Sequence, residues 1–552
     1  MPTQTQGIYI QQSFPFGAFG CRQWSLSEMK RLLRWLKSLG YNRVIFGPWP
    51  TYAEEVEGYN VLETGALMNS GLRGAAPLRP GNRYCPGDRY LGTKEGLENA
   101  AQLRDAMAYA RDIGLGPWIS FAGTIGPPQF CEEHPELLSA APDSNVFLEG
   151  LGLCPSKPKA LQFLLKYNEE QIRYLDSLEG VAMFLRDAGG CHCAACQPQD
   201  QALTKLASTY HTMIKGVSPE LQAALISWHI HISEVPTLAA KLPPDMLIFE
   251  APRIHAIDVP QSEFVERVKR WQESGRRVEG WIEVQENPTA LLPTVYPDRL
   301  SNMIGLMKDL GLSGLWGTAT QNPYLFPLNI WMAMRLWNGC KPAEALITDY
   351  FTESFGKGSV EPGRRYLTEM EKAWDLAQGE SQREAGFLKI FVLSLPRRML
   401  PEKCIQEGVP EAFRSDSGKA VAHARRALEA AEDMADAIRE FHALDANTIV
   451  AGAEVFYWMV RMRDEKIPVL DALHRGDVEE AARGWKVVER AAEEVVAACR
   501  NAPNTDVLAD HWRRLSLLPE RVRSLRKLLP ELAERKRFQQ AVRPHEMRET
   551  YP

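Results

Sequence analysis

A segment in the first half of the chain concentrates residues that could do chemistry. The apolar run 181–185 is bounded by turn-forming glycines and therefore predicts a short buried strand. Arg186, Asp187, two glycines and three cysteines follow it closely. An acid at the end of a buried strand, next to a sharp turn and a group of thiols, is typical of an active-site rim. The plainer interpretation is a strand with an acidic end and incidental cysteines.

The three cysteines follow the pattern Cys-x-Cys-x-x-Cys, at Cys191, Cys193 and Cys196. This compact spacing allows the sulfurs to converge on one metal ion, and a fourth ligand would close a tetrahedral zinc site. We predict Cys154 as that ligand, with a structural site that braces the loop after Asp187. The alternatives for the fourth position are Cys131, Cys85 and His192. An iron–sulfur cluster is less favoured because the Cys-x-x-x-Cys-x-x-Cys pattern of radical enzymes is absent, and the absence of any metal is the remaining alternative.

Acids, aromatic rings and basic side chains also follow the other apolar runs of this half of the chain. The carboxylates that could work with Asp187 are Glu283, Glu250 and Glu286. The candidate substrate-binding residues are Trp49, Arg186, Trp228, His229, His231, Arg253, Trp281 and Trp316. Indole rings stack on the apolar faces of sugars, while two carboxylates can serve as general acid and as nucleophile or base. Together these residues predict a carbohydrate site.

Each candidate also has a plain structural explanation. Asp187 would cap a turn, Glu250 would pair with Arg253, and the tryptophans would pack in the core. Glu283 shares a side of its predicted strand with Trp281, which favours it over Glu286 in the following loop. The two-residue period of a strand places His229 and His231 together on one side. Substrate hydrogen bonding or core packing suits these histidines better than metal binding.

The elements that must position these residues recur along the chain as a helix, a glycine stop and a strand. Leu39-Gly-Tyr, Ile113-Gly-Leu and Leu310-Gly-Leu are three such junctions. The predicted strands are 7–12, 43–46, 116–121, 180–185, 223–229, 246–250, 278–284 and 313–318. Eight αβ units predict a (β/α)8 TIM barrel over residues 1–340, with catalytic groups at the carboxyl ends of the strands. A doubly wound open sheet is less favoured because no Gly-x-Gly-x-x-Gly follows an early strand.

Residues 341–552 have a different character. They are rich in Ala, Glu, Arg and Leu at helical spacing, and strand signals nearly vanish. We predict an all-α helical bundle whose charged stripes are solvated helix faces. The last residues, from Arg535, are basic and predict a loosely held tail.

Composition limits the class of partner. A formal charge of −6 with 24% charged residues gives no sign of nucleic-acid binding. No apolar run is long enough for a membrane helix, and the start has no signal-peptide pattern, so we expect a cytoplasmic protein. Ten cysteines in 552 residues, three of them clustered, suit reduced thiols and one metal site. The sequence does not determine the oligomeric state and is compatible with a homo-oligomer.

Several phrases resemble known families. The phrase Leu153-Cys-Pro-Ser-Lys-Pro158 resembles the one before the catalytic strand in β-N-acetylhexosaminidases, although Ala188 replaces the second acid of their Asp-Glu pair. The stretch from Asp187 to Cys196 resembles a largely uncharacterised bacterial family of barrel proteins related to the hexosaminidases and α-glucuronidases. Further similar phrases are 291–297, 327–338 and 349–356, so the resemblance covers residues 150–380 in islands.

The resemblance implies a glycoside hydrolase barrel followed by a helical domain. By analogy Asp187 would be the proton donor, with Glu283, or else Glu250 or Glu286, as the partner carboxylate. An oligosaccharide or glycoside would be the substrate. Two other classes remain open. One is a metal-dependent lyase or isomerase that acts on a sugar acid, with His229, His231 and Glu250 as ligands; the other is a non-catalytic glycan-binding protein.

Overall fold

The computed structural model divides the chain into two compact units, and each is described here by itself. The first contains the strands up to residue 319, and the second contains residues 342–552. The structure describes residues 4–11, 25–47, 53–56, 59–62, 93–125, 131, 134–140, 152–185, 190–228, 230–251, 261–285, 296–319, 327–339, 341–378, 400, 402–437, 443–501 and 518–534. No helix among these residues has the length and apolar character needed to cross a membrane.

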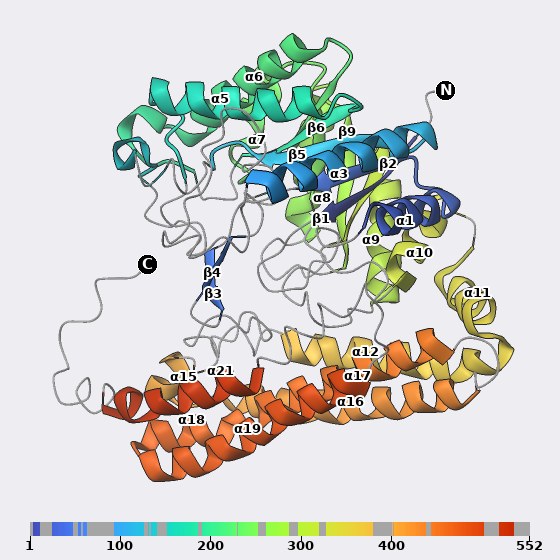
Figure 1. The fold of residues 1–552 in the computed structure, drawn as a ribbon, viewed down its shortest axis with the longest axis vertical. Coiled ribbons are helices and arrows are strands. Elements are labelled where there is room, and N and C mark those ends of the chain that lie inside the picture. Colours follow the sequence, from blue (N-terminus) through green and yellow to red (C-terminus); the bar gives the residue numbers. More distant parts are fainter. Residues whose placement is uncertain are drawn as a thin grey trace. The chain divides into compact units, whose positions relative to one another are not determined.

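Eight parallel strands close into a barrel in the first unit (Figure 1). They are β1 (Thr5–Gln11), β2 (Arg43–Gly47), β5 (Gly116–Ala122), β6 (Gly180–Phe184), β7 (Gln222–Ile226), β8 (Leu247–Glu250), β9 (Val278–Gln285) and β10 (Gly314–Ala319). Each strand pairs with the next barrel strand along the chain, and β10 returns to β1. The predicted (β/α)8 barrel followed by helices is therefore confirmed.

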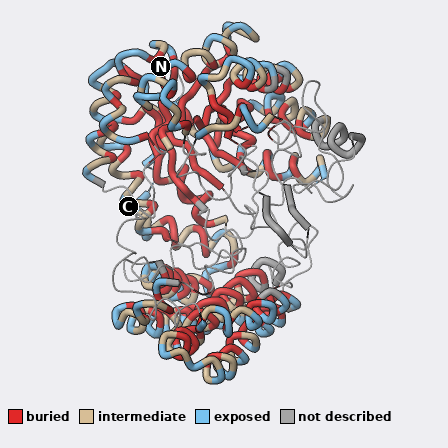
Figure 2. Tube along the Cα trace, turned by 90° about the vertical axis from the view of Figure 1, so that its left-hand side faces the viewer, coloured by how far each residue is buried: buried red, intermediate tan, exposed pale blue. Residues whose placement is uncertain are grey.

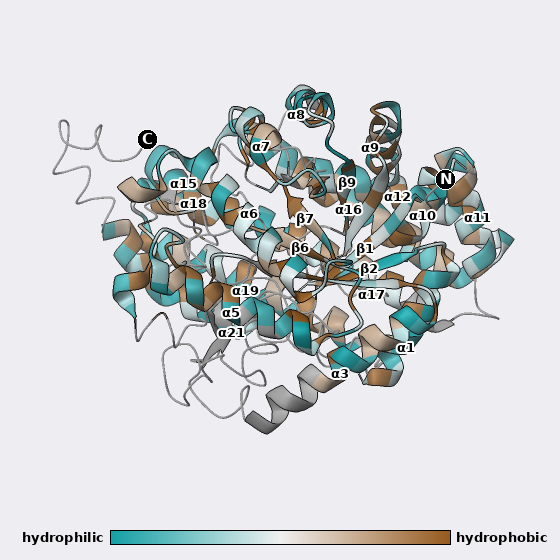
Figure 3. Cartoon of the chain, turned by 90° about the horizontal axis from the view of Figure 1, so that it is seen from above, coloured by the Kyte–Doolittle hydropathy of each residue, from teal (hydrophilic) through white to brown (hydrophobic). Residues whose placement is uncertain are grey.

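Helices follow the strands and cover the barrel. They are α1 (Leu26–Ser38), α3 (Thr93–Asp112), α5 (Pro158–Tyr174), α6 (Gln199–Val217), α7 (Val235–Lys241), α8 (Gln261–Glu273), α9 (Pro297–Asp309) and α10 (Pro327–Trp337). Helix α1 begins with a capping box of Ser25 and Glu28, and Gly40 follows it with a φ of 98°. In Figure 3 these helices alternate between hydrophilic and hydrophobic stretches, as expected when one face packs on a sheet.

Aromatic rings fill the inside of the barrel, where Figure 2 shows the strands as buried. Trp118 and Trp316 meet with ring centroids 5.5 Å apart. Closer to the carboxyl ends of the strands, Tyr9 packs on Trp281 at 5.0 Å. Gly7 makes this filling possible, because a Cβ there would lie 2.1 Å from the Trp316 ring. The interior is a packed core rather than a pore.

A polar group closes the amino-terminal end of the barrel. The Glu279 carboxylate accepts hydrogen bonds from Thr5 Oγ1 at 2.9 Å and Trp316 Nε1 at 2.7 Å, and it pairs with Arg277. Glu279 is fully buried, so these donors satisfy a charge that burial would otherwise penalise.

A two-stranded antiparallel sheet, β3 (Ala53–Val56) and β4 (Tyr59–Leu62), follows β2 and was not part of the sequence prediction. The short run of acids there has no apolar alternation that would have indicated a strand.

The second unit contains only helices among its described residues. They are α11 (Ala343–Phe355), α12 (Val360–Gln378), α15 (Glu402–Glu407), α16 (Glu411–Ala437), α17 (Ala443–Asp464), α18 (Lys466–Arg475), α19 (Val478–Asn501) and α21 (Leu518–Leu525). Helix α16 packs against α12 and α17 through small residues. Its buried face includes Ala420, Ala424, Ala427 and Ala431. Alanine at these positions allows neighbouring helices to approach closely.

Candidate functional site

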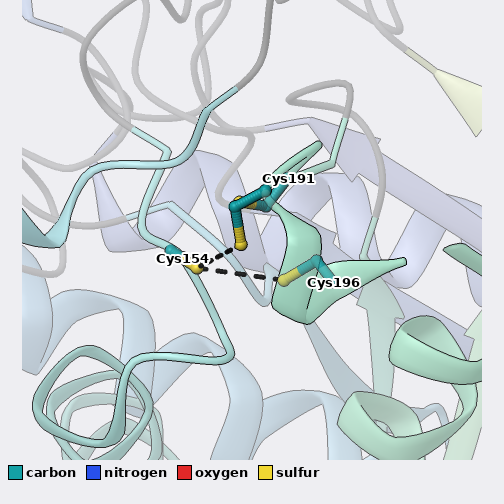
Figure 4. A group of neighbouring side chains, drawn as sticks. Cys154, Cys191 and Cys196 are labelled. Atoms are coloured by element: carbon teal, nitrogen blue, oxygen red, sulfur yellow. Dashed lines mark hydrogen bonds between the residues drawn. The ribbon is translucent and has the colours of Figure 1, made fainter. Parts of the chain in front are cut away.

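Four cysteines from two segments form one cluster, and they are the four predicted as metal ligands. Cys154 lies before α5, whereas Cys191, Cys193 and Cys196 lie between β6 and α6. Figure 4 shows the sulfurs of Cys154, Cys191 and Cys196 pointing toward one another. All four Sγ atoms lie within 4.8 Å of each other, so the cluster could bind a metal ion.

Two distances from Cys154 agree with a tetrahedron of sulfurs. Cys154 Sγ lies 3.7 Å from Cys193 Sγ and 3.8 Å from Cys196 Sγ. Four sulfurs at 2.3 Å from a central zinc ion would be separated by roughly 3.8 Å. A disulfide needs a separation of about 2.05 Å, and all four cysteines are free thiols.

Backbone contacts hold the two segments of the cluster together. Cys154 N donates to Leu137 O at 2.9 Å, so the residue joins the β5–α5 connection. Gln199 Nε2, at the start of α6, donates to Cys191 O at 2.6 Å. Gly190, with a φ of 80°, turns the chain into the cysteine loop. The cluster therefore ties the loop after β5 to the loop after β6.

The electrostatics of the cluster differ from one thiol to another. Ser156 Oγ lies 2.9 Å from Cys154 Sγ and 3.6 Å from Cys193 Sγ. The Ser156 hydrogen bond lowers the pKa of Cys193 to about 6, while burial raises the pKa of Cys191 to about 12. The sequence interpretation did not include Ser156. Its position two residues after Cys154 was the available signal. Of the alternative ligands, Cys131 and His192 are not in the cluster, and Cys85 lies outside the described residues.

The carboxylate of Glu283 lies near the carboxyl end of β9, on the inward side of the strand. Glu279 and Trp281, at the two preceding positions of the same side, both contact residues inside the barrel. Glu283 is 7% exposed. Directly beyond it the pairing with β10 shifts, because Thr318 faces Glu283 and the next residue, Ala319, faces Gln285. This bulge redirects the end of the strand.

A side chain from α10 supports the bulge. Asn329 Nδ2 donates to Val284 O at 2.9 Å, and Asn329 is 1% exposed. The register shift leaves the Val284 carbonyl out of the strand ladder, and the buried Asn329 side chain donates a hydrogen bond to it. The backbone that carries Glu283 is therefore held from both sides.

The ends of β6 and β9 face each other across the barrel. The rings of Phe184 and Trp281 lie 5.7 Å apart, and Tyr9 contacts both. Phe184 is the last residue of β6, and Asp187 follows three positions later. Arg186 and Asp187 themselves lie outside the described residues.

Glu250 is not brought together with Glu283. It leaves β8 on the outer side and lies fully buried against α8, where Arg267 pairs with it at 2.6 Å and Trp271 Nε1 donates to it at 2.9 Å. Phe249, one residue earlier, points inward to Trp316. Burial raises the pKa of Glu250, and the Arg267 charge offsets part of that effect. This placement corrects the expected position of Glu250 at the barrel mouth, because successive residues of a strand face opposite sides. Glu250 pairs with Arg267 and does not stand open to a metal ion, as the lyase alternative requires.

The predicted sugar-binding tryptophans Trp281 and Trp316 are core residues. Trp316 is 0% exposed and packs against Trp118 and Phe249, and Trp281 is 2% exposed. Neither ring has a free face for a sugar, which corrects the expected stacking role. Barrel interiors need bulky side chains, and these two rings meet that need.

Two of the remaining predicted contacts, Trp228 and His231, follow the end of β7. Strand β7 ends at Ile226, and Ile230 N bonds back to Ser227 O in a turn, so the strand period does not apply to His231. His231 is exposed, and its Nδ1 lies 2.7 Å from Ser233 Oγ. Trp228 is half-buried at the same end of the barrel. Besides Arg186 and Asp187, the predicted residues outside the described part of the chain are Trp49, His229, Arg253 and Glu286.

A cavity of about 660 Å³ lies at the opposite end of the barrel, beside the starts of β6 and β7. Its lining includes Arg111, Glu179 and Gln222. Active sites of these barrels lie at the carboxyl ends of the strands, so this cavity is not the candidate site.

Solved structures with a similar fold include glycoside hydrolases. One is a GH138 enzyme targeting pectin rhamnogalacturonan II, with 10% identity, a TM-score of 0.57, and coverage of 96% of this chain and 84% of that one. Another is a GH89 protein from Clostridium perfringens in complex with its substrate GlcNAc-alpha-1,4-galactose, with 10% identity, a TM-score of 0.57, and coverage of 97% of this chain and 64% of that one. No family model and no curated protein matches the chain. At this identity the likeness shows the fold alone.

Proposed function

We propose that the chain is a glycoside hydrolase that cleaves a glycosidic bond with two carboxylates, Asp187 and Glu283. The observation that carries the proposal is the contact of Phe184 with Trp281 at 5.7 Å. It brings the ends of β6 and β9 to opposite sides of one barrel interior, and each strand continues into one of the two acids. The similarity in fold to glycoside hydrolases supports the same reaction class.

In this proposal Asp187 protonates the leaving oxygen, and Glu283 acts as nucleophile or as base toward water. Tyr9, Phe184 and Trp281 form a packed layer on the amino-terminal side of Glu283. This layer keeps water away from that side of the carboxylate. Glu286, three residues later in the loop, is the alternative partner of Asp187. The sugar contacts that we propose are Trp49, Arg186, Trp228, His229, His231 and Arg253.

We further propose that the four-cysteine cluster holds a structural zinc ion. Four thiolates fill a tetrahedral site, so no position stays open for a catalytic water. Cys191 lies four residues after Asp187 in the same loop. The cysteines therefore anchor the far end of that loop, and β6 anchors its near end.

The test is a panel of 4-nitrophenyl glycosides of both anomers, including N-acetylhexosaminides, galactosides, rhamnosides and uronides. We expect the parent to hydrolyse at least one, and Asp187→Asn and Glu283→Gln each to lower kcat by about 10²–10⁴-fold while the fold persists. Glu286→Gln separates the two possible partners of Asp187, and it should retain most of the activity because Glu283 is the proposed partner. The proposal fails if no glycoside is cleaved, or if both carboxylate variants turn over as fast as the parent.

A further inference from the structure

Thr318, in β10, has a buried hydroxyl that nothing in the described part of the chain satisfies. The residue is 4% exposed, and its Oγ1 atom has no hydrogen-bond partner there. Buried hydroxyls are almost always hydrogen-bonded, so an isolated one indicates a partner other than the described residues.

The hydroxyl stands beside the proposed catalytic carboxylate. Thr318 and Glu283 are paired in the register of β10 and β9, and paired strands lie about 4.8 Å apart. Trp316 and Trp281, two residues earlier on each strand, are also paired, and both point into the barrel. The side chains of Thr318 and Glu283 therefore share the inward side of the barrel wall.

The layer beneath this pair is closed. Tyr9, Phe184 and Trp281 pack together on the amino-terminal side of Glu283, with ring centroids 5.0–6.0 Å apart. A ligand that reaches Glu283 must arrive from the carboxyl end of the barrel, and it then also meets Thr318. A sugar hydroxyl is both donor and acceptor, as is the threonine hydroxyl, so the two can pair in either direction.

We propose that the Thr318 hydroxyl hydrogen-bonds a ring hydroxyl of the glycosyl unit that is cleaved beside Glu283, and that it thereby selects sugars with a hydroxyl at that position. The inference rests on the proposed glycosidase function and deepens it. A site built around a buried hydrogen bond rejects ligands that lack the matching group, because the protein hydroxyl is then left unpaired.

Two substitutions at Thr318 separate its hydroxyl from its shape. Thr318→Val keeps the volume and removes the hydroxyl, so we expect kcat/KM on the best 4-nitrophenyl glycoside of the panel to fall about 10- to 100-fold. Thr318→Ser keeps the hydroxyl and should stay within about 3-fold of the parent. The control is Ser120→Ala in β5, which removes another buried hydroxyl without a partner among the described residues but on a strand not adjacent to β9. It should leave kcat/KM unchanged.

Deoxy versions of the same glycoside identify the hydroxyl that is bound. At one ring position, removal of the sugar hydroxyl should cost the parent as much as Thr318→Val does, and it should cost the Thr318→Val variant nothing further. The pH profile of kcat/KM should keep its limbs in Thr318→Val, because the contact is to the sugar. A shift of those limbs would instead mean that Thr318 acts through Glu283 and would overturn the proposal.

Other outcomes also decide the question. Equal kcat/KM in parent and Thr318→Val, equal losses in Thr318→Val and Thr318→Ser, or no coupled ring position would overturn the inference while leaving the glycosidase proposal intact. If the parent cleaves no glycoside, the proposed function fails separately. Calorimetric titration with the free monosaccharides of the panel then tests Thr318. Weaker binding of one sugar to Thr318→Val than to Thr318→Ser supports the proposed hydrogen bond of Thr318. Equal binding to the two variants, or no binding to either, overturns it.

Discussion

Glu250 and Glu283 are two buried acids near the ends of neighbouring strands, yet the barrel wall separates their environments. Glu283 follows the inward side of β9, and Glu250 faces α8 and the Arg267 guanidinium. The difference arises from strand alternation, because one residue along a strand changes the face. At the residue scale the wall therefore leaves Glu283 on the side of the proposed chemistry and places Glu250 in a structural ion pair with Arg267.

Glu250→Gln should reduce stability more than activity. It leaves the Arg267 charge buried without its partner, so we expect a loss of about 3–5 kcal/mol in the free energy of unfolding. Urea denaturation measures this loss, and the folded variant should keep the parent's kcat. Glu266→Gln removes the exposed partner of Arg270 on the same helix and should cost less than about 1 kcal/mol. A stable Glu250→Gln protein without turnover would restore Glu250 to the catalytic set.

At the element scale, the cysteine cluster joins two loops that the barrel strands alone do not connect. Cys154 bonds to Leu137 in the loop after β5, and the other three thiols belong to the loop after β6. Both loops leave the carboxyl end of the barrel. Loss of the cluster should therefore act on the site before it acts on the barrel core.

Cys154→Ser should remove one bound zinc ion per chain, because three remaining thiolates leave the tetrahedron open. Metal analysis by mass spectrometry after dialysis measures the stoichiometry, and limited proteolysis should show faster cleavage in residues 134–140 and 190–198. Cys131→Ser, a change at another buried cysteine outside the cluster, is the control and should retain the metal. Equal metal content in Cys154→Ser and the parent would contradict the zinc assignment.

At the scale of the whole molecule, the two units depend on different cores. Large aromatic rings fill the barrel, whereas alanines on α16 set the helix contacts of the second unit. Charges also join helices there, since Glu369 of α12 accepts from His423 and Arg426 of α16, each at 2.7 Å. At low pH, protonation of Glu369 should weaken the contact between α12 and α16.

The pKa of Glu369 predicts where the helical unit weakens. Burial alone would raise this pKa, but the hydrogen bonds from His423 and Arg426 outweigh burial and hold it below its usual value. A carboxylate whose pKa is lower in the folded state adds stability above its unfolded pKa of about 4.3, and this contribution is lost as the pH falls below that value. We expect Glu369→Gln to remove about 1 kcal/mol at pH 7 and to flatten the loss of stability toward pH 3.

Hydrogen exchange of amides in α12 and α16, measured between pH 3 and pH 7, tests this prediction. Glu429→Gln, at an exposed carboxylate of α16, is the control and should keep the parent's pH dependence. An unchanged acid limb in Glu369→Gln would mean that other groups govern acid unfolding of these helices.

Local patterns in the sequence determined the eight barrel strands and the helical second half. Buried strands, glycine stops and the Ser25 capping box are short-range signals, so each could be recognised without tertiary information. The four cysteines were also predictable, because thiols at this spacing have few other uses in a protein with reduced cysteines.

Only the tertiary structure decided which side of the barrel wall each candidate faces. In the sequence, Trp281 and Trp316 cannot be distinguished from sugar-stacking rings. In the closed barrel both are buried core residues. Glu250 acquired Arg267 and Trp271 from α8, and Thr318 acquired Glu283 as its register partner. These neighbours are distant in sequence, and the direction of a side chain depends on strand ends and bulges that shift by one residue. For that physical reason the chain's composition and spacing predict the barrel, while closure of the barrel determines the neighbours of each side chain.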